Sequence, residues 1–375
     1  RQMSQVRRLK RPMCSQPRRM GAGWKHGRKN MLRRRIKSLI GLDIGSRAIK
    51  AVELTREGHG FVMSGYGQTE VLCEEQRPDA ILEVLRDNSF HTKRVVTAVY
   101  GKSVIVRYLS MTRMPEEDLR NAIRYEADKY IPFDVEDVVM DSQPLPDDHL
   151  MEAAENEMRV LLVAVKRALI DDHVSLLNGL GLQPTVIDVD SFAVGNAFEL
   201  ARGGAFYEED ADRAIALLDI GANKTNINIF YGGTSYFTRE IYLAGDDFTH
   251  AISKRLSLEL DGAEQRKREP GEHPEEVMEA VMPSFDDLAN EILLSFDYFE
   301  NQFDREVEEV YLSGGGARMQ GIEEALERTL NRPTHRWDPT DGIEIHEGTV
   351  DGDRVRSNAG QLAVAVGLAA RVQEL

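Results

Sequence analysis

The stretch Leu42-Asp43-Ile44-Gly45-Ser46 recurs in the second half of the chain as Leu218-Asp219-Ile220-Gly221-Ala222. Each copy ends an apolar run, turns tightly and enters a second run of β-forming residues, at 48–54 and at 225–230. A single Asp-x-Gly turn often does no more than reverse the chain. Two copies in the same strand-turn-strand context indicate an internal duplication that serves one purpose.

That purpose is predicted to be phosphate binding. Phosphates need convergent backbone N–H donors, and a turn without a bulky Cβ brings the backbone close enough to supply them. Gly45 and Gly221 are expected to provide this clearance, while Ser46 and Thr225 can add hydroxyl donors. We expect the two hairpins to face each other across a cleft and to hold one triphosphate between them.

An acid stands at the end of the first strand of each copy, Asp43 in one and Asp219 in the other. Because Mg²⁺ keeps most of its waters in proteins, these carboxylates are predicted to hold the ion through water.

A glycine-rich turn forms the third element. Leu312-Ser313-Gly314-Gly315-Gly316-Ala317 follows an apolar run and precedes a helix that is expected to begin near Met319. Three glycines let the backbone lie against a base or ribose, and the following helix would present its N-terminus to phosphate. The spacing matches neither Gly-x-Gly-x-x-Gly nor a P-loop, so neither a dinucleotide fold nor a P-loop enzyme is supported.

The composition, 42% hydrophobic and 29% charged over 375 residues, is typical of a soluble globular protein with two lobes or domains. No apolar run approaches the length needed to span a bilayer. Cys14 and Cys73 provide neither a disulfide framework nor a metal cluster, which is consistent with a reducing cytoplasm.

Charge is divided unevenly along the chain. Residues 1–38 contain fourteen Lys and Arg and no acid, so the remainder carries 33 basic against 63 acidic side chains. An acidic body argues against nucleic acid as a partner. A basic tail can bind anionic lipid or nucleic acid. The preferred interpretation is that residues 1–37 are an extension outside the fold, either disordered or translated from upstream of the natural start, for which Met31 is a candidate.

The rest of the chain divides into three parts. Residues 38–101 are predicted to form a first lobe with the first hairpin, residues 102–182 an inserted β-α-β-β-α unit, and residues 183–375 the remainder of the first lobe and a second lobe. Residues 257–283 read as a charged, variable excursion. A helix is expected to begin at Ser284, with Ser284 as its N-cap and Asp287, three residues later, as the reciprocal capping residue. Its apolar stripe from Phe285 to Phe303 is expected to lie in the core.

The three elements, in this order, resemble the actin, DnaK-type chaperone and sugar kinase superfamily over residues 38–372. Within it, the chain resembles the PilM family of type IV pilus assembly proteins, which are FtsA-like members. That resemblance rests on two stretches, residues 106–133 (VRYLSM, MP, IRYEA and YIPF) and residues 186–193 (VIDVDSFA). It implies an α/β, actin-like two-lobed ATPase fold with duplicated mixed sheets and a small inserted α+β subdomain.

The resemblance also assigns residues to ATP and Mg²⁺. It places Asp43, Gly45, Ser46 and Lys50 on the first phosphate motif, Asp219, Gly221, Ala222 and Thr225 on the second, Gly314, Gly315 and Gly316 on the adenosine turn, Gly245 at the start of a helix into the upper subdomain, and Glu264 and Lys267 at possible base or ribose contacts.

Three residues depart from the family pattern. Arg47 and Lys224 stand where small or hydroxyl residues are usual, and they either pair with phosphate or point into solvent. Asp190 stands where related ATPases place a longer acid or amide that orients the attacking water. A shorter Asp predicts at most slow hydrolysis, unless Asp188 and Asp190 are merely acids at a strand end.

The function that the resemblance implies is a cytoplasmic ATP-binding adaptor at the inner face of the inner membrane. Such a protein takes the N-terminal cytoplasmic peptide of a PilN-like inner-membrane protein into a groove between the main lobe and the inserted subdomain. Other pilus assembly components are further partners, and the membrane is reached only through them. Candidate groove residues are Arg107, Arg113, Met114 and Tyr130, which could equally hold the insertion onto the lobe.

Two other functions stay open. A sugar-type kinase of the same superfamily would need a sugar-binding cluster, and none is evident around residues 100–180. An FtsA-like division protein would carry a C-terminal amphipathic helix, whereas this sequence ends in Arg371-Val372-Gln373-Glu374-Leu375.

Overall fold

The computed structural model describes residues 37–58, 60–86, 90–146, 156–203 and 212–374. The predicted N-terminal extension, apart from its last residue, lies outside them. Within the described ranges, no helix is both long and apolar enough to cross a membrane.

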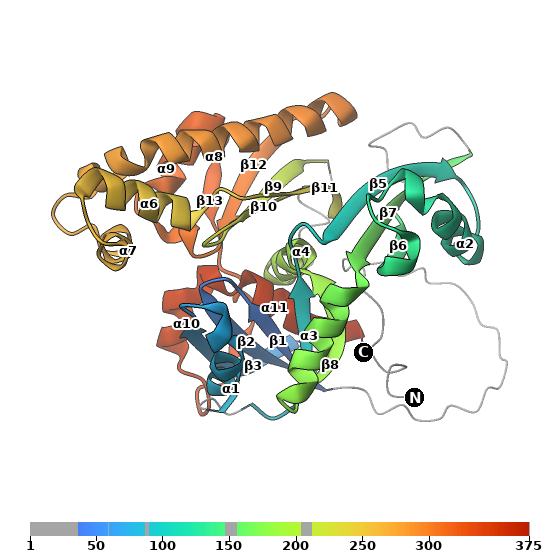
Figure 1. Cartoon of the computed structure of the whole chain (residues 1–375), viewed down its shortest axis with the longest axis horizontal. Coiled ribbons are helices and arrows are strands. Elements are labelled where there is room, and N and C mark those ends of the chain that lie inside the picture. The colour runs from blue at the N-terminus through green and yellow to red at the C-terminus, as the bar shows by residue number, and fades with distance from the viewer. Residues whose placement is uncertain (1–36, 59, 87–89, 147–155, 204–211, 375) are drawn as a thin grey trace.

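The first lobe is built on a six-stranded sheet in the order β14-β3-β2-β1-β4-β8 (Figure 1). β1 to β3 form an antiparallel meander, and β4 and β8 continue the sheet parallel to β1. The strands are β1 (Ser38–Ile44), β2 (Ala48–Glu57), β3 (Gly60–Glu70), β4 (Arg94–Val99), β8 (Gln183–Val189) and β14 (Glu344–Ile345).

Helices cover both faces of this sheet, because side chains alternate between the faces along each strand. Ile40 and Leu42 pack with α1 (Arg77–Arg86) and α3 (Arg167–Gly179). Leu39 packs on the opposite face with α4 (Asp190–Ala201) and α11 (Ala363–Ala369).

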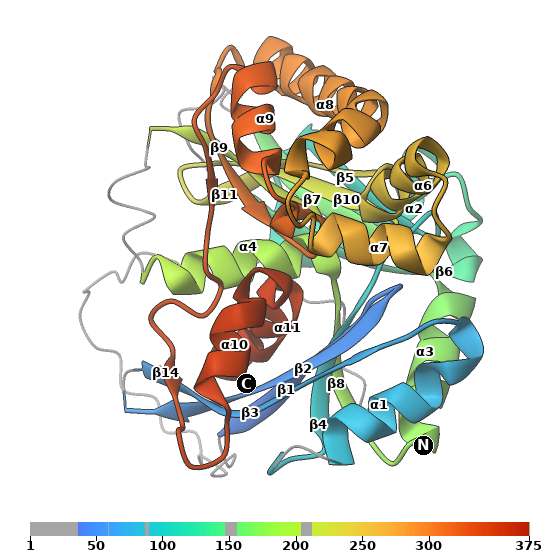
Figure 2. The same ribbon diagram turned by 90° about the vertical axis from the view of Figure 1, so that its left-hand side faces the viewer.

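The second lobe repeats this plan with the order β11-β10-β9-β12-β13. α4 and α11 lie between the two sheets (Figure 2), so the lobes share one central core. The outer face carries the apolar stripe of a long helix. The elements are β9 (Ala214–Ile220), β10 (Thr225–Tyr231), β11 (Thr234–Ile241), α6 (Gly245–Leu256), α7 (Leu260–Arg268), α8 (Pro274–Phe303), β12 (Val307–Ser313), α9 (Ile322–Leu330) and β13 (Thr334–Arg336). The later helix α10 (Gly352–Asn358) returns to the first lobe, where its Val355 packs with Val52 and Met63 (Figure 2).

The inserted unit is a three-stranded sheet in the order β5-β7-β6 with α2 on one face. Its elements are β5 (Val104–Thr112), α2 (Glu116–Glu126), β6 (Val138–Pro144) and β7 (Glu157–Lys166). β7 alternates: Val160 and Leu162 face α2, whereas Leu161 and Val163 join the core of the second lobe. The insertion therefore packs against the second lobe as well as being connected to the first.

Two predicted helix starts are wrong. α8 begins at Pro274, not Ser284, and runs continuously through Pro283. Proline is favoured at the first helical position, and the buried stripe already includes Val277 and Val281, so packing carries the helix past the interior proline. The helix after the glycine-rich turn begins at Ile322, not near Met319, because a short 3₁₀ turn at 316–318 intervenes.

Candidate nucleotide-binding site

The two repeated turns share one geometry. The Gly45 amide donates to the carbonyl of Ala48 (3.2 Å), and the Gly221 amide donates to the carbonyl of Lys224 (2.9 Å). A Cβ on either glycine would lie 2.8 or 2.9 Å from that carbonyl oxygen. A side chain at either position would clash with that carbonyl oxygen. The turn itself therefore requires glycine, whether or not it binds phosphate. These two amides are therefore already used within the turns.

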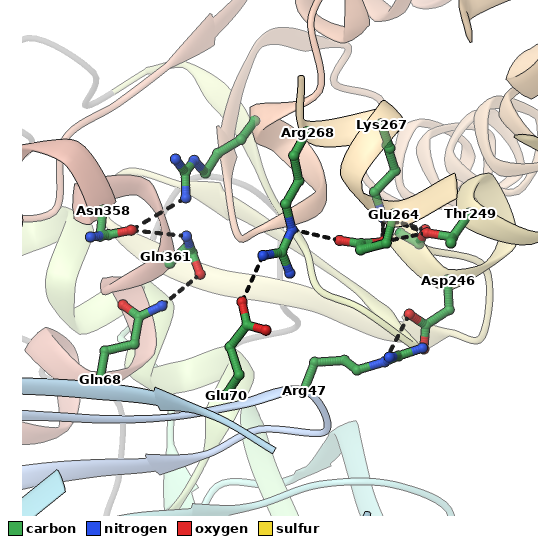
Figure 3. Close-up of polar contacts among 12 residues, drawn as sticks. Arg47, Gln68, Glu70, Asp246, Thr249, Glu264, Lys267, Arg268, Asn358 and Gln361 are labelled. Carbon is green, nitrogen blue, oxygen red and sulfur yellow. Dashed lines mark hydrogen bonds and ion pairs between the residues drawn. The ribbon is translucent and has the colours of Figure 1, made fainter. Parts of the chain in front are cut away.

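The two turns lie at one junction of the lobes, where the start of α6 connects them. Arg47, in the first turn, pairs with Asp246 at the start of α6 (Nε–Oδ1 3.3 Å; Figure 3). The backbone amide of Asp246 donates to the carbonyl of Ala222 in the second turn (2.6 Å), and the Gly245 amide donates to that of Gly221 (3.1 Å). Arg47 therefore spans the distance between the two hairpins and is paired with protein.

The two strand-end acids are neutralised to different extents. Asp43 pairs with Lys50, its cross-strand neighbour (Oδ2–Nζ 2.8 Å). Asp219 accepts a hydrogen bond from the hydroxyl of Ser313 (3.1 Å). Burial raises the pKa of Asp219 to about 6, with further contributions from the charges of Asp190 and Asp43, although Lys50 opposes the shift.

This excess of negative charge fits a hydrated cation. In the described residues, no group of three or more His, Cys, Asp or Glu side chains is placed to hold a metal ion by itself. A Mg²⁺ ion that keeps its waters and binds phosphate oxygens needs no such group, and an under-neutralised carboxylate is a suitable acceptor for its waters.

Lys224 is buried beside the junction of the lobes, so the solvent alternative is wrong for it. Its ammonium lies 2.5 Å from Asp190 Oδ2 and 3.4 Å from Glu240 Oε2. It also lies 4.2 Å from the centre of the Tyr100 ring, which belongs to the first lobe. Glu240 in turn accepts a hydrogen bond from the amide of Gly101 (3.0 Å), where the chain leaves the first lobe for the inserted unit.

The two acids near the end of β8 have different roles. Asp188 is fully buried and forms an ion pair with Arg371, which is also fully buried (Oδ2–Nη2 2.6 Å). It is a structural acid. Asp190 opens α4 and accepts hydrogen bonds from Asn226 Nδ2 (3.0 Å) and from Lys224.

The glycine-rich turn packs directly on the second hairpin. Gly314 has φ +91°, and a Cβ there would lie 2.3 Å from the carbonyl oxygen of Ile220. A Cβ on Gly316 would lie 2.6 Å from the Ile220 side chain. Two of the three glycines are therefore needed for this contact, while Gly315 is exposed. Because α9 starts only at Ile322, its N-terminus does not follow the turn directly as expected.

A polar network joins α6 and α7 (Figure 3). Lys267 donates to the carbonyl of Gly245 (2.8 Å) and pairs with Glu264 (2.6 Å). Although burial opposes it, hydrogen bonds from Lys267, Thr249 and Arg268 lower the pKa of Glu264 to about 2. The network fixes the start of α6 beside the second turn.

Thr225 supports the same region from β10. Its hydroxyl donates to the carbonyl of Leu243 (2.7 Å), just before α6. The hydroxyl predicted to bind phosphate is thus already used to anchor the start of that helix.

Further contacts join the lobes at α7 (Figure 3). Arg268 on α7 pairs with Glu70 at the end of β3 (Nη1–Oε1 2.6 Å) and also with Glu264 (Nε–Oε1 2.8 Å). Together with the Arg47–Asp246 pair, this contact joins the upper part of the second lobe to the first lobe.

A cavity of about 900 Å³ lies between the inserted unit and the start of α3. It is lined by Asp128, Ile131, Pro132, Phe133, Asp134, Asp137, Lys166, Arg167, Ala168 and Asp171. The predicted partner residues Arg107, Arg113, Met114 and Tyr130 are not among them. Arg107 and Arg113 are exposed near β5, whereas Met114 and Tyr130 pack against the core of the inserted unit.

Several residues of the site were not predicted, namely Tyr100, Asn226, Glu240 and Asp246. A signal existed for two of them: Asp246 follows Gly245, and Asn226 is the cross-strand neighbour of Asp219, as Lys50 is of Asp43. Tyr100 and Glu240 reach the site only through the packing of the lobes, which no local pattern reports.

Known proteins share this architecture. The family model described as type IV pilus assembly protein PilM matches residues 41–373. The solved PilM–PilN type IV pilus biogenesis complex contains a chain with 30% identity and a TM-score of 0.78, covering 90% of this chain and 99% of that one. The ethanolamine utilization protein EutJ from Carboxydothermus hydrogenoformans has 15% identity, a TM-score of 0.51 and 89% coverage of both chains.

A curated relative, the cell division protein FtsA of Bacillus subtilis (strain 168), is 25% identical over 165 residues. The match covers 41% of this chain and only 36% of FtsA. These likenesses confirm the actin-like, mixed α/β fold with duplicated sheets that the paired hairpins predicted.

Proposed function

The chain belongs to the family of type IV pilus assembly proteins PilM, and from this membership we propose that it is an ATP-binding adaptor of type IV pilus assembly. The observation that carries the proposal is the pair of matched glycine turns, which Arg47 and the start of α6 connect at one junction of the lobes, within a fold that matches the family over residues 41–373. The adaptor acts at the cytoplasmic face of the inner membrane, which it reaches through its partner.

The nucleotide lies between the hairpins. The amides that follow Gly45 and Gly221 donate to the phosphates, and the hydroxyl of Ser46 is a further donor. Gly315 is the exposed glycine of the adenosine turn, and α7 with Lys267 borders the same space. Mg²⁺ neutralises the phosphates and is held through water by Asp219, with Asp43 a weaker candidate because Lys50 already neutralises it.

The partner is the N-terminal cytoplasmic peptide of a PilN-like inner-membrane protein. The solved relative is a PilM–PilN complex, and the cavity beside the inserted unit is large enough for several side chains of such a peptide. Its lining combines Phe133 and Ile131 with an acidic rim that includes Asp134 and Asp171. A peptide with apolar side chains and a basic or free amino terminus would complement this lining.

Nucleotide binding is tested by titrating the purified chain with a fluorescent ATP analogue in the presence of Mg²⁺. We expect saturable binding that is displaced by ATP and weakened by EDTA, with little phosphate transfer to any sugar. Absence of binding would overturn the nucleotide part of the proposal, and rapid phosphate transfer to a sugar would favour the kinase alternative.

Partner binding is tested with the N-terminal peptide of the PilN-like protein, with and without ATP. Asp171→Arg reverses a charge on the cavity rim and should weaken peptide binding about tenfold or more, because it repels a basic peptide. Asp172→Arg is the matched control, since Asp172 is the next residue on α3 and is exposed outside the lining.

The predicted residues Arg107 and Arg113 provide the competing surface. If Arg113→Glu abolishes peptide binding while Asp171→Arg does not, the peptide lies along β5 and the cavity assignment is wrong.

A further inference from the structure

The two hairpins carry their lysines at different places. The turn-closing bonds make Gly45 equivalent to Gly221 and therefore Ala48 equivalent to Lys224. One copy thus has a methyl group where the other has a long cationic side chain.

The destinations of the two cations differ as well. Lys50 neutralises the strand-end acid of its own hairpin, Asp43. Its counterpart in the second hairpin is Asn226, the cross-strand neighbour of Asp219. Because Asn226 is uncharged, it does not neutralise Asp219, and its side chain donates to Asp190. The positive charge of the second hairpin is therefore directed away from the strand-end acid and onto the acid that opens α4.

The ammonium of Lys224 is enclosed. Asp190 and Glu240 lie on it at 2.5 and 3.4 Å, Asn226 Oδ1 lies at 3.4 Å, and the Tyr100 ring covers it at 4.2 Å. Burial alone would lower the pKa of Lys224, but the two carboxylates outweigh burial and raise it. The side chain stays charged and holds one position.

Both oxygens of Asp190 accept hydrogen bonds within the protein. Oδ1 accepts from the amide of Ser191 (2.8 Å), and Oδ2 accepts from Lys224 and from Asn226. A carboxylate acts as a general base only if one of its lone pairs reaches the proton that it removes. The oxygen that Lys224 and Asn226 share is not available for that task.

We propose that Lys224 is a positioning residue that withholds Asp190 from base catalysis, so that the site retains ATP instead of hydrolysing it. This inference rests on the proposed nucleotide site. In hydrolysis, a water oxygen bonds to the γ-phosphorus and the bond to the β–γ bridging oxygen breaks. ADP leaves with that electron pair, and the water proton passes to a base before release, giving ADP, phosphate and a proton. With Oδ2 occupied by Lys224 and Asn226 and Oδ1 held by the amide of Ser191, Asp190 is a poor acceptor for this proton, and activation of the water is slow.

The test compares Lys224→Met with the wild-type chain at saturating Mg-ATP. Methionine keeps the length and the apolar stem of the side chain but removes the ammonium. We expect kcat for phosphate release to rise about tenfold or more, while the Kd of ATP changes by less than about threefold. Adding Asp190→Asn to Lys224→Met should remove the gain, and Lys224→Arg should restore slow turnover.

Two controls keep the result interpretable. Lys102→Met removes another lysine that lies over a ring, Tyr242 at 5.5 Å, and should leave turnover unchanged. Lys224→Met leaves the carboxylates of Asp190 and Glu240 without a cation between them, which could prevent folding. The charge-balanced variant Lys224→Met with Glu240→Gln is therefore measured as well, and its kcat should also rise about tenfold or more.

The outcomes separate this inference from the nucleotide proposal. Unchanged kcat in a folded variant that binds ATP normally overturns the role of Lys224 and leaves the nucleotide site intact. A loss of ATP affinity above tenfold without any gain in kcat also overturns it, because Lys224 would then be a phosphate ligand. Failure of the wild-type chain to bind ATP would instead overturn the proposed function.

Discussion

Asp219 stands near the end of β9 and has a raised pKa. Its folded-state pKa of about 6 lies above the value of about 3.9 for an unfolded Asp, so the fold favours the protonated acid. This contribution is complete below about pH 4 and is lost as the pH rises through 6, which makes the ionised carboxylate a cost to stability at neutral pH. An acid that destabilises the empty site is a suitable place for a hydrated cation.

We therefore expect Asp219→Asn to stabilise the nucleotide-free chain at pH 7.5 by on the order of 2 kcal/mol, and to have little effect near pH 4. The same change should weaken Mg-ATP binding about tenfold or more, since the negative charge that holds the metal's waters is lost. Thermal melts at both pH values and an ATP titration measure the two effects. A variant that is less stable at pH 7.5, or that binds Mg-ATP normally, would contradict the assignment.

Single residues were predictable from the sequence where the signal is local. Asp43, Gly45, Asp219 and Gly221 lie where the repeated turns put them, because a closed turn of that kind needs glycine. The neighbours of Lys224 were not predictable, since Asp190 comes from an element 34 positions away and the pairing depends on how the lobes pack.

At the scale of the element, α8 shows how tertiary packing overrides a start signal. Ser284 follows Pro283 and precedes Asp287, which locally resembles a helix N-terminus. The helix nevertheless runs through this point, because Val277 and Val281 continue the buried stripe for two turns before it. The spacing of the apolar residues predicts the helix and its buried face. The cap motif at Ser284 predicts the wrong start, because the same apolar spacing continues before it.

This helix provides a direct prediction. Ser284→Ala should change the free energy of unfolding by less than about 0.5 kcal/mol, whereas an N-cap serine would cost about 1 kcal/mol. Pro283→Ala should increase stability by roughly 1–3 kcal/mol, because Pro283 is exposed, lacks the helical amide and clashes with the preceding turn. Urea unfolding of the two variants checks this. A clear loss of stability in Ser284→Ala would place the helix start where the sequence suggested.

At the scale of the whole molecule, two ion pairs join the lobes, Arg47–Asp246 and Arg268–Glu70. Exposed pairs of this kind contribute up to about 1 kcal/mol each and weaken with salt. Glu70→Gln should therefore speed the release of a fluorescent ATP analogue about twofold to fivefold at low salt, and the effect should fade near 1 M salt.

Stopped-flow release measures this effect. Asp353→Asn is the matched control, because Asp353 is an exposed acid whose partner, Arg356, lies on the same helix (2.7 Å) and spans no cleft. Equal release rates for Glu70→Gln and the wild-type chain at low salt would show that this pair does not hold the lobes together.

The overall architecture could be predicted because each copy of the motif marks a strand pair in one of the two sheets. The positions of the two copies also give the order of the sheets along the chain. The contacts that close the lobes could not, since Glu70 and Arg268 lie 198 positions apart and surface charges form pairs according to the final geometry. The same holds for the cavity beside the inserted unit, which depends on how α3 meets that unit.

The hydrogen bond from the Gly101 amide to Glu240 joins the root of the inserted unit to the carboxylate that also contacts Lys224. A displacement of Glu240 is therefore expected to displace the backbone at Gly101, where the insertion leaves the first lobe, and a displacement of Gly101 is expected to move Glu240. Thermodynamic linkage makes such communication reciprocal. If ATP tightens the binding of the partner peptide by some factor, the peptide must tighten the binding of ATP by the same factor, so a chain that holds its peptide would also have the higher affinity for nucleotide.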